Sequence, residues 1–194
     1  MNTRRSPSAR AALAAVLGLC LALGASPARA ELRIGHLSVF LNDSDVTVQV
    51  VLLGAMPEAI REGLHTGIAA HIRLTVELYQ HSRLWADRQV SARTIERQVS
   101  YNPLTKEYKV VSLGGEQRET YLTKDLRDAQ RVASEVRVRG LAPAASLDPK
   151  ALYYVRVRSD VSMAGVNSWF ARFTGSAEET PWVQSNLLTL HRSQ

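Results

Sequence analysis

The chain has 194 residues, 45% of them hydrophobic, with 24 Lys and Arg against 18 Asp and Glu and a single cysteine. This length fits one globular domain. The mixed composition excludes a collagen, a low-complexity disordered protein and a disulfide-stapled mini-protein, because each of those classes needs a strong bias in glycine, charge or cysteine. Composition therefore indicates an ordinary folded domain and points to no particular reaction.

The first 30 residues have the three parts of a secretory signal. Three arginines within the first ten residues precede an apolar stretch at 11–23, which is shorter than the roughly 20 residues of a membrane-spanning helix. Ala28 and Ala30 then place small residues three and one before a cut. We expect signal peptidase to remove residues 1–30 and to release a mature chain that begins at Glu31.

Two other export routes compete for the same residues. A lipoprotein would be acylated at Cys20, but the bulky Leu19 stands where a small residue is expected. Twin-arginine export would use Arg4 and Arg5, but Ser-Pro-Ser follows where apolar residues normally come. General secretion is therefore the predicted route, with the periplasm as the predicted location and the extracellular medium as the alternative.

Removal of the signal changes the charge of the protein. Residues 1–30 carry four arginines and no acid, so the mature chain keeps 20 basic and 18 acidic residues, a net charge of +2. The basic character of the full chain thus supports neither a nucleic-acid partner nor an anionic membrane surface. Cys20 leaves with the signal, which excludes disulfides, cysteine ligands and cysteine nucleophiles from the mature protein. No transmembrane segment is predicted after cleavage.

Strands dominate the mature chain. Two apolar, β-branched runs at 32–40 and 46–53 flank a cluster of turn residues and predict a hairpin. Residues 70–80 show the sharpest alternation of apolar and polar residues in the chain, which indicates a half-buried strand. Asn-Pro-Leu-Thr-Lys at 102–106 turns a second hairpin. Further strands are predicted at 88–101, 108–113, 153–161 and 169–174.

Two short helices are predicted between the strands. Pro57 suits a first helical position, with residues 58–64 making two turns. Thr123 is the predicted N-cap of the second helix, whose apolar positions run to Val136. Residues 31–194 are expected to form one mainly β domain, an antiparallel β-sandwich that is immunoglobulin-like or related, with a weakly patterned tail from about residue 176.

Three short segments resemble a known family. They read Gly-Leu-His-Thr-Gly-Ile at 63–68, Arg-Leu-Trp-Ala-Asp at 83–87 and Ser-Tyr-Asn-Pro-Leu-Thr-Lys-Glu-Tyr-Lys-Val at 100–110. Together they are similar to the proteobacterial family catalogued as domain of unknown function 4390, over roughly residues 31 to 162, whereas the tail departs from it. The resemblance implies an exported protein without an assigned activity, and it supplies no catalytic residues.

Spacing gives little support to a catalytic or metal site. His71 and His81 share a predicted strand face but lie ten residues apart, which is about 33 Å along a strand. Asp43 and Asp45 fit Asx turns better than a calcium loop. No serine stands in a Gly-x-Ser-x-Gly turn. We therefore predict no catalytic, cofactor-binding or metal-ligating residue.

Arginines mark one candidate interaction surface. Arg156 and Arg158 are predicted to face outward from one strand, and Arg93 and Arg97 share a face of another. Adjacent strands would then form an arginine stripe for an acidic partner or a lipid headgroup. The alternative is a cross-strand ladder of arginines and carboxylates, which is the more ordinary arrangement.

Aromatic residues mark a second candidate. Leu84 and Trp85 with Tyr79, or Trp169 with Phe170, would anchor a protein-binding surface, and burial in the core is the alternative. The predicted interaction surface therefore comprises Tyr79, Trp85, Arg156 and Arg158.

Three functions remain open at this point. The first is an exported, non-enzymatic module that binds a protein of the cell envelope, since the sequence offers sheet edges and aromatics but no catalytic constellation. The second is a carrier or sensor of a small apolar or lipid-like ligand held between the sheets. The third is a hydrolase whose site is assembled only in three dimensions.

Overall fold

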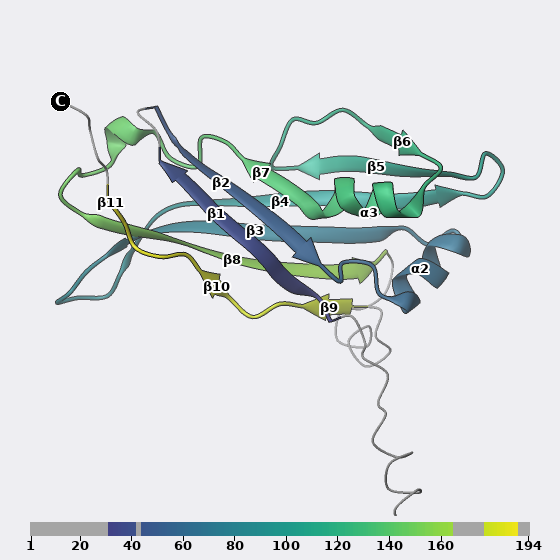
Figure 1. Cartoon of the computed structure of the whole chain (residues 1–194), viewed down its shortest axis with the longest axis horizontal. Coiled ribbons are helices and arrows are strands. Elements are labelled where there is room, and N and C mark those ends of the chain that lie inside the picture. The colour runs from purple at the N-terminus through teal and green to yellow at the C-terminus, as the bar shows by residue number, and fades with distance from the viewer. Residues whose placement is uncertain (1–30, 42–43, 165–176, 190–194) are drawn as a thin grey trace, which may run out of the picture.

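Two antiparallel sheets make up the computed structural model, which describes residues 31–41, 44–164 and 177–189 (Figure 1). The chain is mainly β, as predicted, and the two sheets pack as a sandwich. Its elements are β1 (Arg33–Leu41), β2 (Val46–Leu53), α2 (Glu58–His65), β3 (Ala70–His81), β4 (Arg88–Asn102), β5 (Glu107–Gly114), β6 (Tyr121–Thr123), α3 (Leu126–Ser134), β7 (Glu135–Val138), a 3-10 turn (Ala144–Ser146), β8 (Leu152–Met163), β9 (Ala177–Glu179), β10 (Val183–Gln184) and β11 (Leu188–Thr189).

The smaller sheet has the order β1–β2–β7. β2 is a run of β-branched and aliphatic residues, and the predicted hairpin with β1 is present. β7 pairs with the other edge of β2, where Val50 lies opposite Val136 and Val48 opposite Val138. These four valines are almost completely buried, so they form one apolar face of the sheet.

The larger sheet has the order β10–β8–β3–β4–β5–β6, and β9 and β11 also pair with β8. In β3 the even-numbered residues from 70 to 78 are buried and the odd-numbered ones point to the opposite face, as the alternation predicts. β3 lies between β4 and β8, and it pairs antiparallel with both along nearly its whole length.

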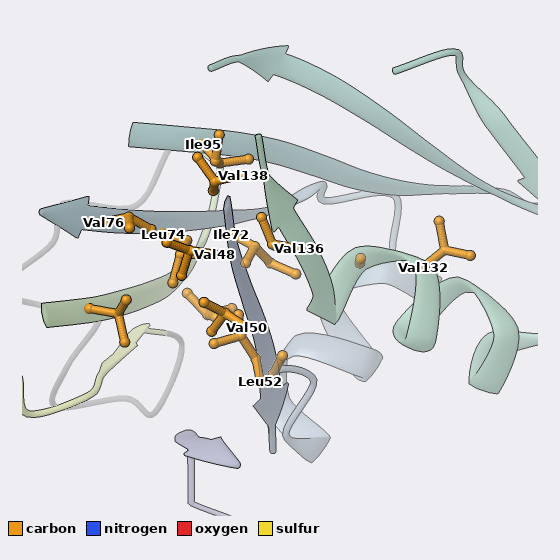
Figure 2. Close-up of a cluster of buried hydrophobic side chains, with 14 of the residues drawn as sticks. Val48, Val50, Leu52, Ile72, Leu74, Val76, Ile95, Val132, Val136 and Val138 are labelled. Atoms are coloured by element: carbon orange, nitrogen blue, oxygen red, sulfur yellow. The ribbon is translucent and has the colours of Figure 1, made fainter. Parts of the chain in front are cut away.

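One hydrophobic core fills the space between the sheets. Figure 2 shows side chains of β2 and β7 facing those of β3 and β4, with Val132 of α3 at one side. Ile72, Leu74 and Val76 from β3 meet Val48 and Val50 from β2 at the centre of this cluster. The inner face of the large sheet is therefore committed to the fold, which leaves its outer face for other contacts.

The helices follow the predicted positions with small shifts. Asp125, not Thr123, is the N-cap of α3, since its carboxylate accepts the Arg127 N–H at 2.9 Å. The hydroxyl of Thr123 instead accepts the N–H of Asp125 at 3.2 Å. α3 ends at Ser134, whereas the helix was predicted to continue to Val136. Val136 instead belongs to β7, a strand that was not predicted. Pro57 is likewise an N-cap and precedes the first helical residue of α2.

The segment at 100–110 builds a hairpin and holds α2. Asn102 Oδ1 accepts the N–H of Leu104 at 2.9 Å, which closes the turn. The rings of Tyr101 and Tyr108, opposite each other on β4 and β5, lie 4.9 and 6.2 Å from the His65 ring at the end of α2. The residues that carry the family resemblance here therefore pack the scaffold.

Arg97 lies in the interior, which corrects the predicted arginine stripe. Its side chain is only 2% exposed and pairs with Glu116, and Arg93 shares its face of β4, donating to the carbonyls of Arg139 and Gly140 at 2.8 and 3.0 Å. Both lie opposite inward residues of β3, whereas Arg156 and Arg158 lie opposite outward ones. The four arginines therefore do not share one surface.

Two predicted segments lie outside the described residues, and the tail has more regular structure than its weak pattern predicts. The predicted strand at 169–174 and the signal segment 1–30, with Ala28 and Ala30, lie outside them. Glu31, the predicted first residue of the mature chain, is exposed. The weakly patterned tail contains three very short strands, β9, β10 and β11, which cover the free edge of β8.

Candidate binding surface

The outer face of β3 and β8 carries a ladder of opposite charges. Arg73 lies opposite Asp160, and Glu77 lies opposite Arg156. Arg73 also contacts Glu96 of β4 at 2.8 Å, and Arg156 contacts Glu77 at 2.6 Å. This is the cross-strand ladder that was the alternative to an arginine stripe.

Beside the ladder lies a group of aromatic and cationic side chains, here called the cation–aromatic cluster: Tyr79, Tyr154, Arg156, Arg158 and Trp182. The rings of Tyr79 and Tyr154 stack with centroids 5.4 Å apart and planes at 9°. The Arg156 guanidinium carbon lies 4.5 Å from the centroids of both Tyr79 and Trp182, and that of Arg158 lies 4.8 Å from Trp182. Both distances are typical of cation–π contacts.

Hydrogen bonds fix the cations of this cluster. Arg156 Nη2 donates to the Tyr79 hydroxyl at 2.8 Å, and the hydrogen bond to Glu77 raises the pKa of the guanidinium further. Arg158 pairs with Glu179 of β9 at 2.7 Å. The side chains of Arg156 and Arg158 still keep 34% and 43% of their surface exposed, so the cluster is ordered without being covered.

Tyr154 connects the cluster to the loop between β3 and β4. Its hydroxyl donates to Asp87 Oδ2 at 2.8 Å. Burial, together with this hydrogen bond to a carboxylate, raises the pKa of Tyr154 to about 12. The hydroxyl therefore stays protonated and remains a donor over the physiological range.

Asp87 closes that loop at its base. Its other oxygen accepts the Ser82 N–H at 2.8 Å and lies 3.1 Å from His81 Nδ1. The Ser82 N–H and the Tyr154 hydroxyl hold the pKa of Asp87 below its usual value. Leu84 and Trp85, at the tip of the same loop, are 87% and 83% exposed, so this pair is not part of the core.

A hollow of about 440 Å³ lies at the other end of the ladder. It is lined by residues of β3, β4, β8 and β9, among them His71, Glu96, Asp160 and Ser162. Burial raises the pKa of Asp160, although Arg73 opposes that shift. The hollow is thus a polar site on the outer face, distinct from the valine-lined space between the sheets.

Residue types that occur in hydrolases meet at the rim of this hollow. His71 and Ser162 lie directly opposite each other in the β3–β8 register, and Asp160 lies two residues along β8. Within the described residues no hydrogen bond joins these three side chains, and the charges that act on Asp160 come from Arg73, Glu179, Arg158 and Glu96. The described ranges 31–41, 44–164 and 177–189 also hold no group of three or more histidine, cysteine or acidic side chains arranged to hold a metal ion.

The structure places three of the four predicted interaction residues together. Tyr79, Arg156 and Arg158 belong to the cation–aromatic cluster, and Trp85 lies on the loop that continues from β3. The sequence did not predict that Trp182, Tyr154, Asp87 and Glu77 take part in this surface. The alternation of β3 and β8 places Glu77 and Tyr154 on the outer face, but only the pairing of Val183 with Val157 brings Trp182 there.

The comparisons with known proteins identify the family. The sequence description of Domain of unknown function (DUF4390) matches residues 29–180, so the chain belongs to the DUF4390 family. The match extends further toward the C-terminus than the resemblance over 31–162 and includes β9. No curated protein and no solved structure matches the chain. Among the described residues no helix has the length and apolar character needed to cross a membrane.

Proposed function

We propose that this chain is an exported, non-enzymatic module of the cell envelope that binds a protein partner through the cation–aromatic cluster. The observation that supports it is the contact of the Arg156 guanidinium with the rings of both Tyr79 and Trp182, whose centroids each lie 4.5 Å from its carbon. Tyr, Trp and Arg are the residues most enriched at the energetic centres of protein interfaces. Here they are already ordered, which lowers the entropy lost on binding.

The charges around the cluster suit a protein surface. Glu77 and Glu179 balance Arg156 and Arg158, so this face carries no large excess of one sign. A partner with an apolar recess and a polar rim would cover Trp182, which is 37% exposed, while leaving the ion pairs in place. The signal pattern of residues 1–30 supports the export part of this proposal.

Site-specific photocrosslinking in cells tests the binding proposal. A photoreactive residue at position 182 should give a discrete adduct with one protein, and Arg156→Ala in the same chain should reduce that adduct. Arg137, on the small sheet, is the matched control position because its side chain points away from the core. Equal adducts from positions 182 and 137 would contradict the proposal. The mass of the protein from the envelope fraction should correspond to a chain that begins at Glu31.

A second candidate, hydrolysis, has one observation in its favour, the juxtaposition of His71, Ser162 and Asp160 at the hollow. A fluorophosphonate probe should label the intact protein and not Ser162→Ala if Ser162 is a nucleophile. Such labelling would overturn the non-enzymatic proposal.

Native mass spectrometry of the purified protein tests the ligand-carrier alternative, since a bound small molecule adds a reproducible excess mass.

A further inference from the structure

The loop between β3 and β4 extends beyond the end of the large sheet (Figure 1). Four consecutive residues at its tip, Arg83 to Ala86, are exposed. Leu84 and Trp85 are the two most apolar of them and keep 87% and 83% of their surface in water. Scattered single apolar residues on a surface are ordinary, but an adjacent leucine and tryptophan at a projecting tip form an exposed apolar contact.

The base of the loop is held firmly although its tip is exposed. Asp87 accepts the Ser82 N–H and the Tyr154 hydroxyl, each at 2.8 Å. Ser82 Oγ in turn accepts the Trp85 N–H at 3.1 Å. A tip that is ordered before contact loses less conformational entropy when it binds.

Three cations lie on or near the loop that carries this apolar pair. Arg83, Arg88 and Lys150 are all exposed at this end of the molecule. Within the described residues none of them forms an ion pair with an acid, and Arg88 contacts the uncharged Gln80 Oε1 at 2.7 Å. Asp87 is the acid of the loop, and its carboxylate is already used at the loop base.

A shallow hollow of about 390 Å³ separates the tip from residues 150–152. Arg83, Trp85 and Lys150 line it, so two cations and an aromatic ring border one open space. This arrangement matches a phosphate-bearing headgroup beside an acyl chain, because cations attract the phosphate and tryptophan prefers the boundary between headgroups and hydrocarbon.

We propose that this tip docks the protein on a membrane surface that contains anionic phospholipid. Leu84 and Trp85 enter the interface, and Arg83, Arg88 and Lys150 lie at the level of the headgroups. The contact is peripheral and reversible, because two apolar side chains bury little area. It depends on local charge and not on the small net charge of the mature chain. The proposal is separate from the binding of a protein at the cation–aromatic cluster, since a different set of residues carries it.

Tryptophan fluorescence gives the direct test. In the mature chain, Trp169→Phe and Trp182→Phe leave Trp85 as the sole tryptophan. Its emission should shift to the blue, and brominated acyl chains should quench it, with vesicles of phosphatidylcholine and phosphatidylglycerol but not with phosphatidylcholine alone. High salt should reverse the shift, because salt screens the attraction of the cations.

Cosedimentation with the same vesicles then assigns the residues. Trp85→Ala should lower the partition coefficient by about tenfold, given the area of the ring. Arg83→Gln and Lys150→Gln should each lower it by about fivefold. Leu104→Ala and Lys106→Gln are matched controls, since Leu104 is 92% exposed in the turn at the opposite end of the sheet (Figure 1). Neither control should change the partition coefficient.

Three results would overturn the proposal. The first is an unshifted Trp85 emission with anionic vesicles, and the second is a partition coefficient that Trp85→Ala leaves unchanged. The third is a partition coefficient that the Leu104 and Lys106 controls lower as much as the substitutions at the tip do. A Trp85 shift induced by a purified protein partner but by no vesicle would make the tip a protein-binding site instead. Circular dichroism of each variant separates a lost contact from a lost fold. Crosslinking at position 182 is read out independently of vesicle binding, so the two proposals fail separately.

Discussion

Arg97 and Glu116 form an ion pair inside the protein, with Nε and Nη2 of the arginine 2.5 and 2.8 Å from the two oxygens of the glutamate. The remaining nitrogen, Nη1, donates to the carbonyls of Val132 and Glu135 at 2.8 Å and of Ala133 at 3.2 Å. These carbonyls belong to the end of α3 and the start of β7. One side chain of the large sheet therefore satisfies the helix terminus that leads into the small sheet.

Replacing Arg97 should be strongly destabilising. We expect Arg97→Met to lower the free energy of unfolding by about 3–5 kcal/mol, because Glu116, whose side chain is only 14% exposed, loses its partner and three carbonyls lose a donor. Urea denaturation measures the loss. Arg88→Met, at an exposed position of the same strand, should stay within about 0.5 kcal/mol of the wild type. Similar losses in both variants would contradict the assigned role of Arg97.

Gly115 should tolerate no side chain. Its φ is 79°, and a Cβ atom there would stand 1.9 Å from the backbone oxygen of Thr94. The left-handed conformation alone costs other residues about 1–2 kcal/mol, and the backbone contact adds to it. We expect Gly115→Ala to lower the melting temperature well below that of Gly114→Ala, whose Cβ atom would meet nothing within 4 Å. An equal effect of the two substitutions would refute this prediction.

Tyr154 should make the protein sensitive to alkali. Its pKa rises from 10.0 to about 12 on folding, so the folded state retains a proton that the unfolded state loses first. The stabilisation is complete below pH 10 and is lost as the pH rises toward 12. Tyr154→Phe should flatten this decline when unfolding is measured by urea at several alkaline pH values. A decline of unchanged steepness in the variant would show that another group is responsible.

Asp160 should lower the stability of the folded protein at neutral pH, where its carboxylate is ionised. Burial raises its pKa above 3.8, so the folded state favours the protonated form. Its contribution to stability therefore falls as the pH rises from 3.8 through the raised folded pKa, and at neutral pH the ionised group is unfavourable. Asp160→Asn should stabilise the protein at neutral pH, and the difference should shrink in acid. Chemical denaturation at both pH values checks the sign, and a destabilised variant at neutral pH would be the contrary result.

Alternation along single strands was enough to predict most of the sandwich. Residues 70–78 show it without interruption, and β3 has the predicted faces there. Alternation does not identify an element where the helix and strand periods overlap. Val132 and Val136 are four residues apart, which fits a helix, yet Val136 lies in the four-residue strand β7. Local periodicity cannot separate a short strand from the helix that precedes it.

Only the part of the cation–aromatic cluster that lies on the outer face of β3 and β8 could be predicted from the sequence. Tyr79, Arg156 and Arg158 follow from the alternation of β3 and β8, whereas Trp182 joins them through β10, a strand of two residues without a pattern of its own. Arg97 was misassigned because a charged residue on a strand is usually exposed. Its burial depends on Glu116 and on the end of α3, which are remote in sequence.

The central position of β3 also determines the order in which the sandwich can assemble. β3, β4 and β5 are joined by short turns, so their pairing is local. β8 reaches β3 only after a separation of more than 70 residues, and the closure of so long a loop is slow. We therefore expect the β3–β4–β5 meander to form first, with one long edge of β3 unpaired until β8 pairs with it. During that interval the edge is available to another chain, so the time before β8 docks is when the protein is most exposed to misassembly.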